Sequence, residues 1–177
     1  MNNALAHRAE RHHTPALVVV GVAALAVVGV ACSSGSDKKG GQAAPSASVG
    51  QAVRDGKFEF TVNNVNCGAA RVGGDVTGET AQGQFCLVNL TVKNIGDQAQ
   101  MLDASSQLGY SADGSKYDAN SMASIAANEG TQTFLNNINP GNQVTGTVAF
   151  DVPKDKTLTK VELHDSPASG GVTVQVS

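Results

Sequence analysis

The chain has 177 residues, a formal net charge of −3, 41% hydrophobic residues and no tryptophan. From residue 53 onward, eight Lys and Arg face thirteen Asp and Glu. This acidic balance argues against nucleic acid as a partner, because its phosphates require a basic surface. The three cysteines are an odd number, so one is left over if the other two pair in an oxidising compartment.

Residues 1–31 have the composition of a signal peptide rather than that of a folded domain. Arg8 and Arg11 form a basic start, and residues 16–31 follow as an apolar run without any charge. This run is shorter than the about 20 residues that a membrane-spanning helix needs, and it fits the apolar centre of a secretory signal. We therefore predict that the chain is exported.

Cys32 stands directly after this run and is preceded by Gly29, Val30 and Ala31. Small residues before a cysteine resemble a bacterial lipobox, whose cysteine is lipidated and becomes the mature N-terminus; Gly29 stands where that pattern usually has leucine. More than one acyl chain at a single residue anchors a protein stably. We predict a lipoprotein held at the extracellular face of the cell membrane through Cys32. The alternatives are an ordinary secreted protein cleaved nearby and an uncleaved N-terminal anchor.

Residues 32–52 are predicted to form a flexible linker. Small and polar residues dominate there, and none is aromatic. Such a composition buries too little apolar surface to offset the entropy of ordering. A spacer of this length has a root-mean-square span of about 25 Å, which would hold a domain away from the membrane. Residues 53–177 are long enough for one domain.

The clearest strand is predicted within residues 84–97. Cys86, Val88, Leu90 and Val92 alternate with more polar neighbours, and turn-forming residues follow from position 94. A period of two is typical of a strand with one face in a core.

Another strand is predicted over residues 57–68, before a glycine-rich loop at 69–83. Phe58, Phe60 and Val62 share one face, but Val65 and Cys67 have the opposite parity. A regular strand cannot turn both sets inward. We therefore predict a β-bulge at Asn63–Asn64, where one additional residue restores the register.

The rest of the domain also reads as short strands separated by turns. In residues 143–152, Val148 and Phe150 are predicted to face inward and Ala149 outward. Residues 121–130 stay open between a short strand, a loop and a single helical turn. The other strands are predicted at 101–102, 107–112, 116–117, 132–138, 158–163 and 172–176, with turns at 113–114 and 139–142.

This pattern predicts an all-β fold, an immunoglobulin-like antiparallel β-sandwich of seven to nine strands. In an exported protein, Cys67 and Cys86 are expected to form one disulfide. The alternative is two free buried thiols. Closing a loop of this length by a disulfide stabilises a domain by about 3 kcal/mol.

Several stretches together resemble a known family. They are FTVNNVNCG from residue 60, GQFCLVNLTVKNIGD from residue 83, INPG from residue 138 and VAFDVP from residue 148. The resemblance is to extracellular immunoglobulin-like domains of unknown function in actinobacterial and other Gram-positive lipoproteins, akin to the mycobacterial secreted immunogenic antigens. It implies a β-sandwich and surface exposure, and it brings no catalytic residue with it.

The domain contains no recognisable catalytic or metal-binding pattern, so we predict that it is not an enzyme and uses no cofactor. His164 is its single histidine and stands beside Asp165 and Ser166. Adjacency in sequence does not make a triad, and His164 is expected to be an ordinary surface residue. Residues 113–118 supply oxygen ligands but lack the spacing of a twelve-residue calcium loop, so a polar turn is expected there.

We therefore expect a cell-surface lipoprotein that presents a non-catalytic binding domain to an envelope or host protein. Sandwiches often bind through their loops, and the loops at 69–83 and 113–130 are the expected sites, marked by a groove or an apolar patch. The alternatives are a small solute- or metal-binding envelope lipoprotein and, least favoured, an envelope hydrolase that uses His164.

Overall fold

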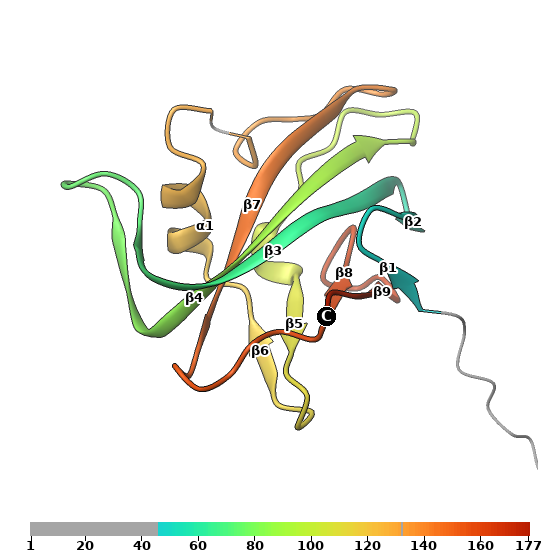
Figure 1. Ribbon diagram of the computed structural model, residues 1–177. Helices are drawn as coiled ribbons and strands as arrows, with labels where there is room; N and C mark the ends of the chain where they lie inside the picture. The colour runs from blue at the N-terminus through green and yellow to red at the C-terminus, as the bar shows by residue number, and fades with distance from the viewer. Residues whose placement is uncertain (1–45, 132) are drawn as a thin grey trace, which may run out of the picture. The chain divides into compact units, whose positions relative to one another are not determined.

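The computed structural model describes residues 46–131 and 133–177. The leader and Cys32 lie outside these residues. The described part contains nine strands, one α-helix and one short 3-10 helix (Figure 1). In chain order they are β1 (Ala47–Ser48), β2 (Ala52–Asp55), β3 (Phe58–Val72), β4 (Glu79–Asn94), η1 (Ala104–Ser106), β5 (Leu108–Tyr110), β6 (Lys116–Asp118), α1 (Ser121–Ala127), β7 (Gln143–Val152), β8 (Lys160–Leu163) and β9 (Val172–Gln175).

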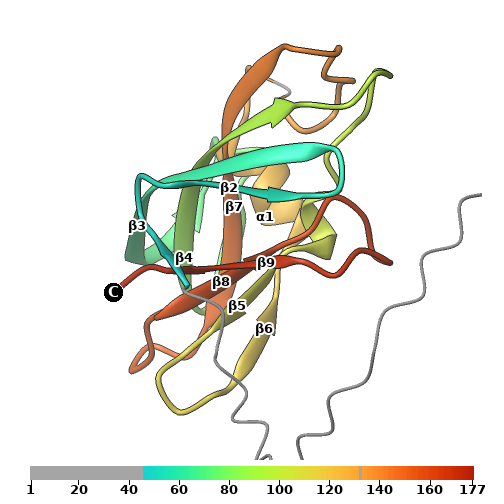
Figure 2. The same ribbon diagram turned by 90° about the vertical axis from the view of Figure 1, so that its right-hand side faces the viewer.

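The strands form two sheets that face each other (Figures 1 and 2). One sheet has the order β2-β3-β4-β7 and the other the order β1-β9-β8-β5-β6. Neighbouring strands are antiparallel, except that β1 runs parallel to β9. The predicted all-β sandwich is confirmed, with β1 as a parallel addition.

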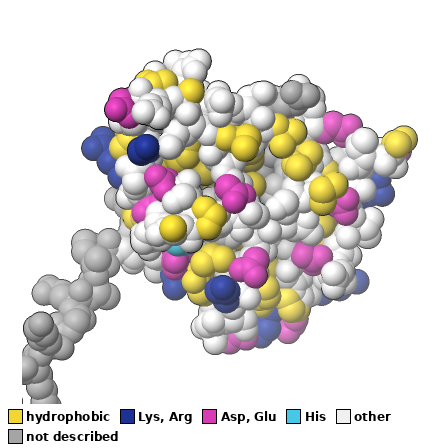
Figure 3. Space-filling view, turned by 180° about the vertical axis from the view of Figure 1, so that it is seen from behind, with side chains coloured by type: hydrophobic (Ala, Val, Ile, Leu, Met, Phe, Trp, Pro, Cys, Tyr) yellow, Lys and Arg dark blue, Asp and Glu magenta, His cyan; other side chains and the backbone are white. Residues whose placement is uncertain are grey.

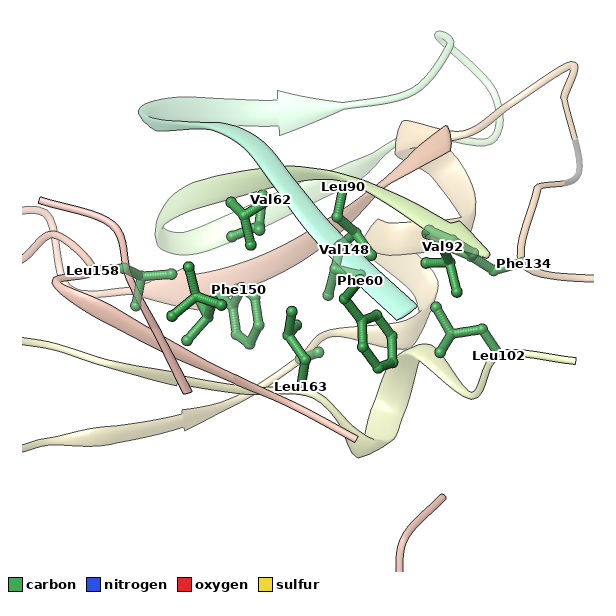
Figure 4. Packing of buried hydrophobic residues seen from close by; sticks show 14 of the residues in the cluster. Phe60, Val62, Leu90, Val92, Leu102, Phe134, Val148, Phe150, Leu158 and Leu163 are labelled. Carbon is green, nitrogen blue, oxygen red and sulfur yellow. The ribbon is translucent and has the colours of Figure 1, made fainter. Parts of the chain in front are cut away.

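The main core fills the space between the sheets. Phe60, Leu90 and Phe150 come from the four-stranded sheet; Leu163 reaches them from β8 of the other sheet, and Leu158 from the connection between β7 and β8 (Figure 4). All five side chains are buried. With no tryptophan available, the core rests on phenylalanine, leucine and many valines.

Strand β4 has the predicted period of two. Cys86, Val88, Leu90 and Val92 are fully buried on its inner face. Phe85 is also fully buried, although it points to the opposite face. It belongs to a second, smaller cluster with residues of α1, so part of the outer face of this sheet is covered as well.

The bulge predicted at Asn63–Asn64 is confirmed. In the β3–β4 ladder Val62 pairs with Leu90 and Asn64 pairs with Asn89, so Asn63 is the additional residue. This additional residue restores the register, so Val65 and Cys67 pair with inward-facing residues of β4 as Val62 does.

The prediction of a loop over residues 69–83 is wrong for most of that range. Strand β3 continues to Val72 and β4 begins at Glu79, so only residues 73–78 connect them. Further register shifts on either side of Ala69 allow the strand to continue through this glycine-rich sequence. The extended hairpin is stabilised by packing against α1, which a single-strand pattern does not reveal.

Two predicted short strands are absent from the described residues. Residues 101–102 and the described part of 132–138 are irregular, apart from an isolated bridge between Gln100 and Ile138. Leu102, Phe134 and Ile138 are nevertheless buried and join the main core. Burial, rather than strand pairing, explains the apolar residues of these segments.

Residues 121–130, left open by the sequence, contain α1. Asn120 caps the helix by accepting a hydrogen bond from the Ala123 amide at 2.9 Å. Helix α1 also corrects one detail of β7, because Ala149, predicted to face solvent, is fully buried beneath the helix.

Other expectations are confirmed with shorter bounds. Residues 107–112 contain β5, and the Asp113–Gly114 turn joins it to β6. Asn142 donates its amide to the Asn139 carbonyl at 3.0 Å, and Gly141 has φ +78°, which closes the predicted turn at 139–142. Strands β8 and β9 lie within the predicted ranges 158–163 and 172–176.

The folded domain begins earlier than the sequence indicates. Ala47 and Ser48 pair with Val174 and Gln175, so the end of the predicted linker at 32–52 belongs to a sheet. Across residues 46–131 and 133–177, no helix combines the length and apolar character needed to cross a bilayer.

Candidate binding groove

A groove of about 710 Å³ lies beside α1. Four segments line it: the β3–β4 turn and the start of β4 at 76–79, residues 101–105 with the start of η1, residues 121–130 of α1 and its following turn, and residues 133–135. Both loops expected to carry a binding site contribute to it, and so do two segments that were predicted to be strands.

The groove gathers exposed apolar side chains. Among the described residues, seven large hydrophobic side chains are exposed, and five of them line the groove. These five are Val76, Met101, Met122, Ile125 and Leu135. A concentration of exposed apolar side chains around one groove marks an interaction site more often than scattered residues do. On the face shown in Figure 3, hydrophobic side chains form several groups with acidic side chains between them.

Helix α1 presents two different faces. Met122 and Ile125, three positions apart, line the groove. Ala123 and Ala126 are buried against the outer face of the four-stranded sheet. The small alanine side chains allow the helix to lie close to the strands, so its larger side chains remain exposed.

Polar side chains of α1 and of Asn128, the residue that caps its C-terminal end, fix the helix to the free edge of β7. Asn128 accepts the Thr147 amide at 2.9 Å and donates to the Thr147 carbonyl at 2.7 Å. The Ser124 hydroxyl accepts the buried Ala149 amide at 3.0 Å. These contacts satisfy backbone groups that an edge strand otherwise leaves unpaired. The helix therefore replaces a neighbouring strand at this point.

The β3–β4 turn is fixed to the end of α1 by one carboxylate. Glu129 accepts the Gly74 amide at 2.8 Å and the Thr77 hydroxyl at 2.7 Å. Gly73 has φ +80°, and a Cβ there would lie 2.9 Å from the Ala126 side chain. Glycine is thus required both by the backbone conformation and by the close approach of the helix.

The charged groups of the groove are acidic. Asp103, Glu129 and the half-buried Glu79 line it, and its lining includes no lysine or arginine. Hydrogen bonds from Ser105 hold the pKa of Asp103 below its ordinary value, and hydrogen bonds from Thr77 and Gly74 do the same for the pKa of Glu129. The Glu79 carboxylate makes no hydrogen bond or ion pair with the described residues.

The predicted disulfide joins Cys67 and Cys86, nineteen positions apart in the sequence. The two cysteines face each other directly in the β3–β4 ladder, so the bond lies within one sheet. Beyond it, the hairpin extends toward α1 and carries one wall of the groove.

His164 is not the surface residue that the sequence suggested. Its side chain is 11% exposed, and its Nε2 lies 3.0 Å from a Glu162 carboxylate oxygen. Its Nδ1 lies 3.3 Å from the Ser169 hydroxyl, which donates to the Ser166 carbonyl. The neighbouring Asp165 instead accepts the Lys57 amide at 2.9 Å. None of these residues lines the groove.

The polar turn at 113–118 is held by its own side chains. Asp113 accepts hydrogen bonds from Ser111 and from the Ser115 amide, and it forms an ion pair with Lys156 at 3.1 Å. The Ser111 hydroxyl is the main reason that the pKa of Asp113 lies well below its ordinary value. Within the described ranges, no three His, Cys, Asp or Glu residues come together in a way that could hold a metal ion.

The sequence indicated the two loops. It did not predict that Met101 and Leu135 line the groove, or that residues 121–127 form a helix. One signal was present: Met122 and Ile125 alternate with small residues at helical spacing. With only seven residues in the helix, that signal was too short to recognise.

A family described as "Domain of unknown function (DUF4352)" matches residues 47–174. The chain belongs to this family. Its first matched residue coincides with the start of β1, in agreement with the observed beginning of the DUF4352 domain. No curated protein matches the chain.

Solved structures share the fold of this DUF4352 domain. The secreted protein MPT63 of Mycobacterium tuberculosis is 21% identical, covers 70% of this chain and 92% of its own, and superimposes with a TM-score of 0.53. The yjhA protein of Bacillus subtilis is 16% identical, with 74% and 99% coverage and a TM-score of 0.53. A conserved hypothetical protein of Bacillus anthracis is 17% identical, with 74% and 95% coverage and a TM-score of 0.52. At these identities the similarity establishes the β-sandwich fold.

Proposed function

We propose that this chain is an exported lipoprotein, anchored in the cell membrane through Cys32, whose DUF4352 domain binds a partner through the groove beside α1. The observation that carries the proposal is the concentration of exposed apolar side chains there, five of the seven in the described residues. The domain acts by binding and not by catalysis. The apolar run before Cys32 and the small residues around it support export and anchoring.

The groove has the features of a protein-binding site. Its apolar lining supplies binding energy, and its walls are held in place by the Asn128 and Glu129 contacts. A preformed site loses little conformational freedom when it binds. An envelope or host protein is the proposed partner.

Crosslinking in intact cells tests the binding site. A photoreactive amino acid is placed at Ile125 in the groove and, as the matched control, at Ile95 outside it; the two isoleucines are 42% and 39% exposed. A discrete protein adduct is expected from position 125 and not from position 95. Equal adducts from both positions, or none from position 125, would refute the groove as a binding site.

Replacing Cys32 with alanine tests the anchor. The variant is expected to lose incorporation of a radiolabelled fatty acid and to leave the membrane fraction. Retention of both label and membrane association would show that Cys32 is not the lipidated residue.

A further inference from the structure

We infer that the groove receives a peptide segment of its partner that carries apolar side chains next to lysine or arginine. This inference rests on the proposed function and specifies the chemistry of the ligand. Three features support it: the apolar lining, its flexible methionines, and acidic groups in a lining that contains no lysine or arginine.

The apolar side chains suit a peptide better than a rigid small molecule. Met101 and Met122 project into solvent from separate walls of the groove, and Met122 is 61% exposed. Methionine is unbranched and polarizable, so it adapts to differently shaped apolar side chains. Grooves that accept an amphipathic segment commonly use such residues to receive its apolar anchors.

The charges of the groove indicate that the ligand carries positive charge. Glu79, Asp103 and Glu129 all line the groove, and no lysine or arginine does. Asp103 and Glu129 are already fixed by hydrogen bonds from the protein. Glu79 makes no contact of this kind within the described residues, and it is half-buried. A half-buried carboxylate without a partner gains most from a cation that arrives with the ligand.

The same charges disfavour acidic lipids and fatty acids. A phosphate or carboxylate headgroup in the groove would meet three carboxylates, and the lining itself supplies no lysine or arginine. Arg71 lies beside Gly78 at the rim, but its guanidinium already donates to the Gly74 and Asp75 carbonyls. A cationic peptide satisfies both the apolar surface and the charge, and it is the occupant that the groove favours.

A library of random twelve-residue peptides, displayed on phage, provides the test. The exported chain is purified in detergent and used for selection. Enriched peptides are expected to combine apolar residues with a surplus of lysine and arginine. Their affinity is expected to fall when NaCl is raised from 50 to 500 mM, because salt screens exposed ion pairs. Enrichment of neutral or acidic peptides would overturn the inference.

Matched variants locate the binding. Ile125→Asp is expected to weaken the enriched peptides at least tenfold, whereas Ile95→Asp, at nearly equal exposure outside the groove, retains their affinity. Glu79→Gln is expected to weaken them about two- to fivefold, the effect of one ion pair that stays partly open to solvent, and Asp97→Asn is the control. Unchanged binding in Ile125→Asp or in Glu79→Gln would contradict the inference.

Vesicles of phosphatidylglycerol distinguish a peptide ligand from a lipid. If the vesicles bind in an Ile125-dependent manner and no basic peptide is enriched, the inference is wrong and the groove is a lipid site. A partner crosslinked at position 125, together with no preference for basic peptides, would leave the proposed binding function intact and remove only this assignment of ligand chemistry.

Discussion

The two faces of the four-stranded sheet bury apolar residues in different ways. On the inner face, Phe60, Leu90 and Phe150 meet a second sheet and are fully buried. On the outer face, α1 covers Phe85 with alanines and leaves larger side chains such as Met122 in solvent. The inner face therefore supplies most of the stability, and the outer face carries the exposed apolar side chains on which the proposed binding rests.

Changes on the inner face are expected to have the largest effect. Phe150→Ala removes a fully buried ring between the sheets, and the cavity should lower the free energy of unfolding by about 3–5 kcal/mol. Urea denaturation measures this loss. Leu135→Ala, at a half-exposed groove position, is the control and should change stability by less than about 0.5 kcal/mol. Similar losses in both variants would remove the distinction between the faces.

Removal of the disulfide should have the next largest effect. Replacing Cys67 and Cys86 together with serine is expected to lower the free energy of unfolding by about 3 kcal/mol, since the unfolded chain gains freedom. Urea denaturation, compared with the unmodified protein under oxidising conditions, measures this. If the double variant is as stable as the parent protein, the bond contributes nothing to the domain.

Detaching α1 should affect the outer face selectively. Asn128→Ala leaves the Thr147 amide and carbonyl without their partner, at a cost of about 1–3 kcal/mol. Hydrogen exchange should accelerate in α1 and at Thr147 while the amides of Leu90 stay protected. Asn66→Ala is the control, because among residues 46–131 and 133–177 the exposed Asn66 side chain donates only to that of Asn64. Uniform acceleration across both faces would show that the two regions unfold as one unit.

Acid should produce the smallest effect. Hydrogen bonds hold the pKa values of Asp103, Asp113 and Glu129 below their ordinary values in the folded chain. The unfolded chain therefore binds more protons near pH 4, and the stabilisation is complete above the ordinary values of about 4 and is lost as the pH falls toward the folded-state values. The urea midpoint should decrease between about pH 5 and about pH 3. Asp113→Asn should flatten this decrease, whereas a slope equal to that of the parent protein would show that Asp113 does not contribute.

The inner face was largely predictable from the sequence because strict alternation reveals it. The period of two located β4 and β7, and the parity change between Val62 and Val65 located the bulge. The outer face was not predictable in this way. Ala149 looked exposed because a strand pattern does not show which helix will cover it. Phe134 was assigned to a strand because an apolar residue between polar ones suggests strand burial. It is in fact buried from an irregular segment.

The groove itself was predictable only as a region. Glycine-rich and polar stretches indicated where loops would lie, but the groove forms where four segments far apart in the sequence meet. The contact of Glu129 with the β3–β4 turn joins positions 52 and 55 residues apart, and no local pattern indicates such a pairing. The partners of His164 are close in sequence but were still missed: Glu162 lies two positions earlier on β8, and Ser169 reaches the ring from the loop between β8 and β9.

The way in which α1 occupies the edge of β7 also bears on self-association. An uncovered edge strand offers unpaired amides and carbonyls to the same edge of another molecule, and such pairing leads to aggregation. Because Asn128 and Ser124 already bind the β7 backbone at Thr147 and Ala149, neighbouring copies find no template for an additional strand there. The short helix therefore blocks strand pairing at this part of the β7 edge, while its opposite side leaves Met122 and Ile125 exposed.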